Sequence, residues 1–249
     1  MARSAAFGDP SRSRFQLSFV DDRGGECRDD LAGCWGAAFE DVEPVRSFPS
    51  FKGQRNFPGW WWSSTSGRHV GHESWLERDH AMLLDFDPDV TGFASQPFRL
   101  HWLDEERART HVPDFFARLA DGTGVVIDVR ADDRIEPVDA AAFAATELAC
   151  DEVGWSFRRV GVIDPVFVAN VRWLSRYRHP RCSHRGDITN RLLEVFTTRM
   201  PLFDGARAVG DTLAVLPALF HLLWCQVLAA DLETVPLGPS SQVALGRLR

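Results

Sequence analysis

Two aspartates lie at positions in a predicted β-hairpin where they could bind a metal ion. Residues 114–119 and 125–129 are β-prone apolar runs flanking an Asp-Gly-Thr-Gly sequence at 121–124, and a turn of this kind between such runs favours a hairpin. Asp114 follows a proline at the start of the first run, and Asp128 interrupts the second. Because a carboxylate inside a buried strand is costly without a partner, we expect a cation or hydrogen-bond donors beside Asp128.

Carboxylate oxygens on paired strands are hard ligands of the kind that Mg²⁺ or Mn²⁺ prefers, and such an ion can polarise a phosphoryl oxygen. Asp128-Val129-Arg130 forms an acid-x-basic triplet. Arg130 carries a permanent charge that suits a phosphate, but it is a poor activator of water. An alternative stays open, in which Asp128 and Arg130 form only ion pairs at the end of a sheet.

A third carboxylate comes from an upstream helix. Gly71–Leu84 has apolar residues at mixed three- and four-residue spacings with acidic residues in its first turn, which is typical of an amphipathic helix. Glu77 has two interpretations. It could complete a metal site with Asp114 and Asp128, or it could close a capping box with Ser74.

These motifs together resemble the TnsA-like endonuclease subunits of heteromeric transposases, in the actinobacterial branch. The resemblance rests on Glu77, on DFDPDVTGFASQPFRLHW at 85–102, on His-Val-Pro-Asp-Phe-Phe at 111–116 and on Val-Ile-Asp-Val-Arg at 126–130, and it runs from about Phe48 to the end of the chain. It implies a nuclease domain with the type II restriction-endonuclease fold.

By position, the resemblance makes Glu77 the helix carboxylate, Asp114 the first strand carboxylate and Asp128-Val129-Arg130 the acid-x-lysine triplet. The chain departs from the pattern at Arg130, and its only lysine, Lys52, belongs to a different motif. The implied activity is Mg²⁺-dependent cleavage of double-stranded DNA at transposon 5′ ends, with Mn²⁺ as an alternative ion. A separate DDE-type transposase partner would act at the 3′ ends.

Two other functions stay open. Arginine in place of lysine is compatible with a nuclease fold that has lost its chemistry and serves as a DNA-binding or assembly subunit. The chain could also be a stand-alone restriction or repair nuclease, which would cleave without a partner.

Composition is that of a globular protein, with 249 residues, 45% hydrophobic residues and a formal charge of −7. No apolar run approaches the length of a membrane span, so we expect a cytoplasmic, nucleoid-associated protein without membrane contact. The five cysteines lack CxxC spacing, which favours unpaired thiols and disfavours a structural zinc at Cys182-x-His184.

Two basic segments could contact DNA phosphates despite the acidic total. The first, at 172–191, interleaves arginines with Trp173 and Tyr177, and its alternative is a solvated helix end. The second, at 45–65, is rich in aromatic residues that could stack on DNA or, as we favour, pack across the core. The predicted contacts are Lys52, Arg55, Arg172, Arg176, Arg178, Arg181 and Arg185.

We predict an α/β fold in three parts. Residues 1–44 form a poorly ordered extension with a short strand at 15–20. Residues 45–180 form a restriction-endonuclease-like mixed sheet flanked by helices, and residues 181–249 form a small, mainly helical, winged-helix-like domain. Beyond the hairpin, the expected strands are Phe93–Trp102 and Trp155–Ile163, and the expected helices are Glu136–Val153, Asp164–Tyr177, Asp187–Arg199 and Leu213–Val227, followed by a small hairpin near 230–245.

Overall fold

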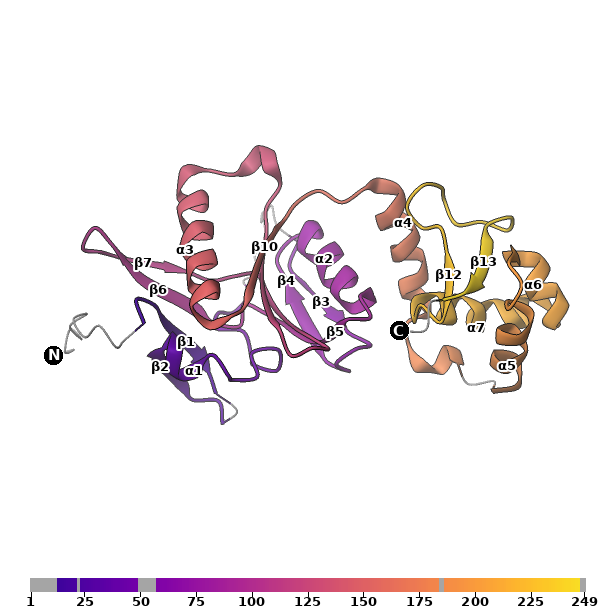
Figure 1. Ribbon diagram of the computed structural model, residues 1–249, viewed down its shortest axis with the longest axis horizontal. Helices are drawn as coiled ribbons and strands as arrows, with labels where there is room; N and C mark the ends of the chain where they lie inside the picture. The colour runs from indigo at the N-terminus through magenta and orange to yellow at the C-terminus, as the bar shows by residue number, and fades with distance from the viewer. Residues whose placement is uncertain (1–12, 22, 49–56, 184–185, 247–249) are drawn as a thin grey trace. The chain divides into compact units, whose positions relative to one another are not determined.

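The protein has a mixed α/β fold. A computed structural model describes residues 13–21, 23–48, 57–183 and 186–246, and this part of the chain contains seven α-helices and four β-sheets (Figure 1). The chain divides into two compact units, the first of residues 1–81 with 89–162 and the second of residues 82–88 with 163–249. No helix of the described chain is long and apolar enough to cross a membrane. No disulfide bond joins any of the five cysteines, all of which lie among the described residues.

The first unit is built on a four-stranded sheet of order β10-β9-β8-β5. The predicted hairpin is confirmed as β8 (Phe115–Leu119) and β9 (Gly124–Val129), antiparallel about a turn in which Gly122 has φ 90°. Strand β5 (Val90–Ser95) pairs antiparallel with β8, and β10 (Ser156–Val160) pairs parallel with β9.

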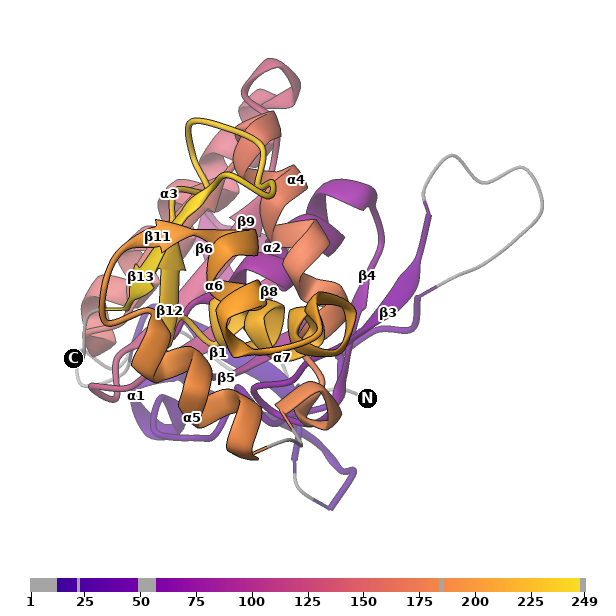
Figure 2. The same cartoon turned by 90° about the vertical axis from the view of Figure 1, so that its right-hand side faces the viewer.

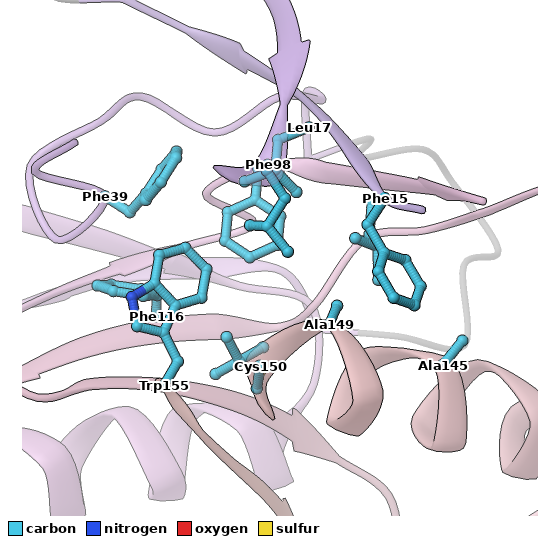
Figure 3. Packing of buried hydrophobic residues seen from close by; sticks show 12 residues of the cluster. Phe15, Leu17, Phe39, Phe98, Phe116, Ala145, Ala149, Cys150 and Trp155 are labelled. Carbon is cyan, nitrogen blue, oxygen red and sulfur yellow. The ribbon is translucent and has the colours of Figure 1, made fainter. Parts of the chain in front are cut away.

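Helix α3 (Pro137–Val153) connects the parallel strands β9 and β10, as predicted, because parallel neighbours need a long crossover. A capping box between Glu136 and Asp139 and a proline in the first turn fix its start, and Gly154 at φ 74° ends it. Ala145, Ala149 and Cys150 of this helix are buried in the core (Figure 3).

Helix α2 (Trp75–Phe86) begins later than the predicted Gly71. The preceding residues form β4 (His69–His72), which pairs antiparallel with β3 (Gly59–Trp62). The side chain of Ser74 then accepts a hydrogen bond from the backbone amide of Glu77 at 3.1 Å, which marks the helix start.

The predicted single strand Phe93–Trp102 is wrong. It is broken into β5 and β6 (Arg99–Asp104), which belong to different sheets. Gln96 between them has φ 47°, and the following Pro97 has no amide proton to donate to a ladder, so the chain leaves one sheet and enters another.

The prediction of a poorly ordered extension over 1–44 is also wrong for its described part. The short strand predicted at 15–20 is confirmed as β1 (Gln16–Val20), and it is followed by β2 (Glu26–Asp30) and α1 (Leu31–Cys34). These strands extend the β6–β7 hairpin into a sheet of order β2-β1-β6-β7, in which β7 is Arg107–His111.

The N-terminal segment also completes the main core. Phe39 is fully buried, and its ring makes edge contacts with Phe98, Phe116 and Trp155 at centroid distances of 5.1, 5.7 and 5.6 Å. Figure 3 shows these rings gathered with Leu17 and Phe15 of the N-terminal segment. Burying rings of this size stabilises the fold, so residues 15–39 belong to the domain rather than to a tail.

The second unit contains α4 (Pro165–Leu174), α5 (Gly186–Val195), α6 (Leu202–Val209) and α7 (Thr212–Trp224). Its sheet of order β11-β13-β12 is formed by β11 (Met200–Pro201), β12 (Leu228–Ala230) and β13 (Gln242–Leu245) (Figure 2). The predicted late hairpin is thus present as β12 and β13. The second unit consists of two stretches, 82–88 and a longer one that begins at Ile163. The predicted boundary between the domains was at residue 180.

Candidate active site

Asp114 lies directly before β8, and its carboxylate is tied to the neighbouring strand. The backbone amide of Val129 donates a hydrogen bond to Oδ2 of Asp114 at 2.7 Å. Burial raises the pKa of Asp114 well above its ordinary value, and the charges of Asp128 and Glu77 raise it further. The strand pair therefore holds Asp114 where negative charge accumulates and where a cation would be stabilised.

Glu77 projects from the first turn of α2 and has a capping role. Its carboxylate oxygens accept hydrogen bonds from the Glu73 amide at 2.6 Å and the Ser74 hydroxyl at 2.8 Å, while Oγ of Ser74 accepts from the Glu77 amide. Burial raises the pKa of Glu77, and these hydrogen bonds partly oppose the rise. One half of the predicted capping box is present, because Ser74 accepts from the Glu77 amide, while the Glu77 carboxylate accepts from the Glu73 amide instead of the Ser74 amide. This capping does not exclude the other role, because Glu77 and Asp114 line the same cavity.

Asp128 near the end of β9 is only 3% exposed and faces a histidine. Nε2 of His111, the last residue of β7, lies 2.9 Å from both carboxylate oxygens of Asp128. An ionised carboxylate can only accept hydrogen bonds, so this geometry makes the ring nitrogen the donor. The predicted partner of Asp128 is therefore present, although sequence reasoning did not identify it as His111.

Arg130 follows the same strand and reaches the start of α3. Its guanidinium lies 3.1 Å from Oδ1 of Asp139, and its backbone amide donates to the Val160 carbonyl at 2.8 Å. The side chain remains 45% exposed and lines the same cavity as Asp114. An anchored and partly exposed guanidinium can bind an anion without first being ordered.

The cavity in the first unit has a volume of about 720 Å³. Acidic residues and arginines line it together, and Arg46 and Glu73 form an ion pair of 2.7 Å at its wall. Its charged residues are Arg46, Glu73, Glu77, Asp114, Arg130, Asp133 and Arg134. The arginines of such a site can bind a phosphate group, and its carboxylates can bind a metal ion that accompanies the phosphate.

The structure brings together Glu77, Asp114 and Arg130 but not Asp128, which is absent from the residues that line the cavity. Across the described residues, no group of three or more His, Cys, Asp or Glu side chains is arranged to hold a metal ion. The three-carboxylate cluster predicted from sequence is therefore not assembled here, because Asp128 faces His111 while Glu77 and Asp114 face the cavity.

The predicted DNA-contacting arginines of the second unit have different environments. Arg172, Arg176 and Arg181 are exposed, and the Arg176 guanidinium lies 5.0 Å from the ring centroid of Trp173. Arg178 instead donates to the Ser175 carbonyl at 2.7 Å, and burial lowers its pKa. Lys52, Arg55, His184 and Arg185 lie outside the described residues.

Among the nearby residues that sequence reasoning missed, His111 and Arg46 are the most important. His111 is three residues before Asp114, in the same His-Val-Pro-Asp motif, so its proximity to the site had a sequence signal. Arg46 had none, because it reaches the cavity from a segment without regular secondary structure.

Comparison with known proteins adds no assignment. A scan against protein-family models finds no match, and a search of curated proteins finds no match either.

Proposed function

We propose that this chain is a metal-dependent DNA endonuclease of the TnsA-like kind, which hydrolyses phosphodiester bonds. The observation that carries the proposal is the position of Asp114, fixed at the start of β8 by the Val129 amide and sharing a cavity with Glu77 and Arg130. The negative charges of Asp128 and Glu77 both raise the pKa of Asp114.

The order of elements supports the same assignment. Helix α2 is followed by β5, the β8–β9 hairpin, α3 and β10, with β10 parallel to β9. This is the order that the resemblance to a restriction-endonuclease fold implies, and the β6–β7 hairpin is inserted between β5 and β8. The active carboxylates of such a fold would come from α2, β8 and β9.

Two carboxylates that line the cavity, Asp114 and Glu77, offer the hard oxygen ligands that a divalent cation prefers, and a cation there would offset the like charges around Asp114. Asp114 and Glu77 would hold the ion, whereas Asp128, the third ligand predicted from sequence, contacts His111 and would join them only by releasing that histidine. Mg²⁺, or Mn²⁺ in its place, would polarise the phosphoryl oxygen of the DNA and favour attack by water.

The remaining roles belong to arginines of the cavity. Arg130 would bind a non-bridging oxygen of the scissile phosphate and stabilise the charge that builds up in the transition state. The ion pair with Asp139 would orient its guanidinium for this purpose. Arg134 is exposed and lines the same cavity, so it can contact a neighbouring phosphate.

The proposed substrate is double-stranded DNA at the 5′ ends of a transposon, with a DDE-type transposase as partner. In the second unit, α5, α6 and α7 precede β12 and β13, an order that is compatible with a winged-helix-like domain. Such a domain could bind DNA or the partner protein. Both roles are compatible with the proposed cytoplasmic, nucleoid-associated location.

Cleavage of supercoiled plasmid carrying transposon ends tests the proposal. The wild-type protein should nick this DNA with Mg²⁺ or Mn²⁺ and the transposase partner, and Asp114→Asn and Glu77→Gln should reduce nicking at least about 100-fold. Asp104→Asn removes a carboxylate that is 52% exposed and outside the cavity, and serves as the matched control. Undiminished nicking by Asp114→Asn would exclude this site, and nicking without the partner would favour a stand-alone restriction or repair nuclease.

A second candidate is a nuclease fold without chemistry, acting as a DNA-binding or assembly subunit. The contact of His111 with both oxygens of Asp128 favours it, because that carboxylate already has a partner. Calorimetric titration with Mn²⁺ separates the two candidates. A nuclease should bind the ion and lose this binding in Asp114→Asn, whereas an assembly subunit should give no heat of binding in either protein.

A further inference from the structure

Two exposed aromatic rings lie at the cavity, although apolar groups of this size are usually buried. Phe57 is 56% exposed and Trp75 is 52% exposed. Their ring centroids are 5.5 Å apart with an interplanar angle of 31°, and both residues line the cavity that contains Asp114 and Glu77. They come from different elements, since Phe57 precedes β3 and Trp75 is the first residue of α2.

The Trp75 ring is held in place by a charged side chain. The guanidinium of Arg78 lies 4.4 Å from the ring centroid of Trp75. Arg78 itself donates from Nε and Nη2 to Oδ1 of Asp79, at 3.2 and 2.6 Å. A ring ordered in advance loses little conformational freedom when a flat ligand stacks on it.

Positive charge lies beside the aromatic pair. Arg46, Arg130 and Arg134 line the same cavity, and Arg134 forms no ion pair with any described residue. Exposed rings next to arginines match the two parts of a nucleotide, a flat base and an anionic phosphate. A purely apolar partner would leave Arg134 without a counter-charge, whereas Arg46 and Arg130 already pair with Glu73 and Asp139.

We propose that Phe57 and Trp75 form a stacking platform for an unpaired nucleobase of the DNA strand whose phosphate enters the cavity. This inference deepens the proposed nuclease function and rests on it. In an intact duplex both faces of a base are covered by its neighbours, so a base can reach the platform only after it leaves the stack. The protein should therefore prefer DNA with an unpaired nucleotide beside the cleavage site.

Equilibrium binding without divalent metal tests the platform separately from cleavage. The probes are a fluorescein-labelled single-stranded 12-mer, the matching duplex, and the duplex with one unpaired 2-aminopurine. Trp75→Ala and Phe57→Ala should each weaken binding of the single strand and of the bulged duplex by about 5- to 100-fold, the range for loss of one stacked base. Binding of the intact duplex should change less than about 3-fold, because its bases do not reach the platform.

The control variants separate stacking from general disruption of the fold. Trp75→Phe keeps an aromatic face and should recover most of the binding. Trp35→Ala removes a tryptophan of similar exposure, 49%, that does not line the cavity, and should bind all three probes like the wild type. Fluorescence of 2-aminopurine should be quenched by the wild-type protein and not by Trp75→Ala.

Each contrary result has a distinct meaning. If Trp75→Ala binds the bulged duplex as tightly as Trp35→Ala does, the platform is excluded while the nuclease proposal stands. If the wild type quenches 2-aminopurine but does not cleave any DNA with Mg²⁺ and the transposase partner, the nuclease proposal fails and stacking survives. If Trp75→Ala loses only binding of the transposase partner, the rings form a protein interface and the proposal is overturned.

Discussion

Nε2 of His111 lies 2.9 Å from both oxygens of Asp128, a carboxylate that is 3% exposed. The histidine ends β7 and the aspartate lies in β9, so the contact joins the two four-stranded sheets of the first unit. Because a buried carboxylate without a donor is costly, this contact explains how Asp128 is accommodated inside the fold.

His111→Ala should therefore destabilise the first unit by about 1–3 kcal/mol, the cost of leaving a buried polar group without its partner. Asp128→Asn should lower the free energy of unfolding less in the His111→Ala protein than in the wild type. In the His111→Ala protein, asparagine removes a buried charge that has already lost its partner. Urea unfolding of the four proteins in a double-mutant cycle measures this coupling. Strictly additive effects would show that the two side chains do not depend on each other.

Asp114→Asn should increase stability, in contrast to most changes at buried polar residues. Burial and the charges of Asp128 and Glu77 raise the pKa of Asp114, so its ionised form opposes folding at neutral pH. Asparagine removes this charge, and its amide oxygen can still accept from the Val129 amide. Each kcal/mol of relieved repulsion should raise Tm by about 2–4 °C in a protein of this size.

Differential scanning fluorimetry at pH 7 measures this change, with Asp104→Asn as the exposed control. Addition of Mg²⁺ should raise the Tm of the wild type and not that of Asp114→Asn, because binding to the folded state stabilises it. A lower Tm for Asp114→Asn than for the wild type would mean that the Asp114 charge stabilises the fold.

The elements near the proposed site were predictable because their signals are local. The Asp-Gly turn located the β8–β9 hairpin, and Pro137 with the alanine-rich run located α3. Ser74 and Glu77 carried a local signal for the start of α2, although the helix was predicted from Gly71 and begins at Trp75. In each case neighbouring residues determine the conformation, so pairing over long distances was not needed.

The remaining features depend on distant contacts. The short strand at 15–20 was predicted, but its pairing with β6 through Gln16 and His101, which are far apart in sequence, was not, so its segment was interpreted as an extension. The break after β5 depends on Gln96 adopting φ 47°, a conformation that its residue type does not predict. The orientation of Asp128 toward His111 likewise follows from β7, a strand that the sequence analysis did not identify.

Gly124→Ala should destabilise the first unit although alanine usually favours ordered structure. A Cβ atom at Gly124 would lie 2.7 Å from Cζ of Phe116 and 2.8 Å from Cδ1 of Trp155. Both rings are buried in the core, so they cannot move without disturbing their neighbours, and overpacking of this kind costs about 1–3 kcal/mol. Urea unfolding should give a lower midpoint for this variant.

Gly36→Ala is the matched control, because a Cβ there meets no atom within 4 Å. Its free energy of unfolding should equal or slightly exceed that of the wild type, since alanine reduces the freedom of the unfolded chain. Equal effects of the two substitutions would contradict the close packing of Phe116 and Trp155 against β9.

His101→Gln should reduce the loss of stability at acidic pH. Burial lowers the pKa of His101 to about 4, and Arg28 and Arg99 act in the same direction. In the unfolded chain a histidine has a pKa of about 6.5, so the unfolded state binds the proton more tightly than the folded state does. The contribution of neutral His101 is therefore complete above pH 6.5 and is lost as the pH falls toward 4.

Glutamine cannot be protonated in this range, and it can still form a hydrogen bond with Ser18, whose Oγ lies 2.8 Å from Nε2 of His101. Urea midpoints measured from pH 4.5 to 7.5 should therefore vary less with pH in His101→Gln than in the wild type. His72 and His80 also have lowered pKa values because of burial, so part of the pH dependence should remain. His69→Gln removes an exposed histidine of β4 and is the control. If both variants keep the wild-type pH profile, His101 is not the source of the acid sensitivity.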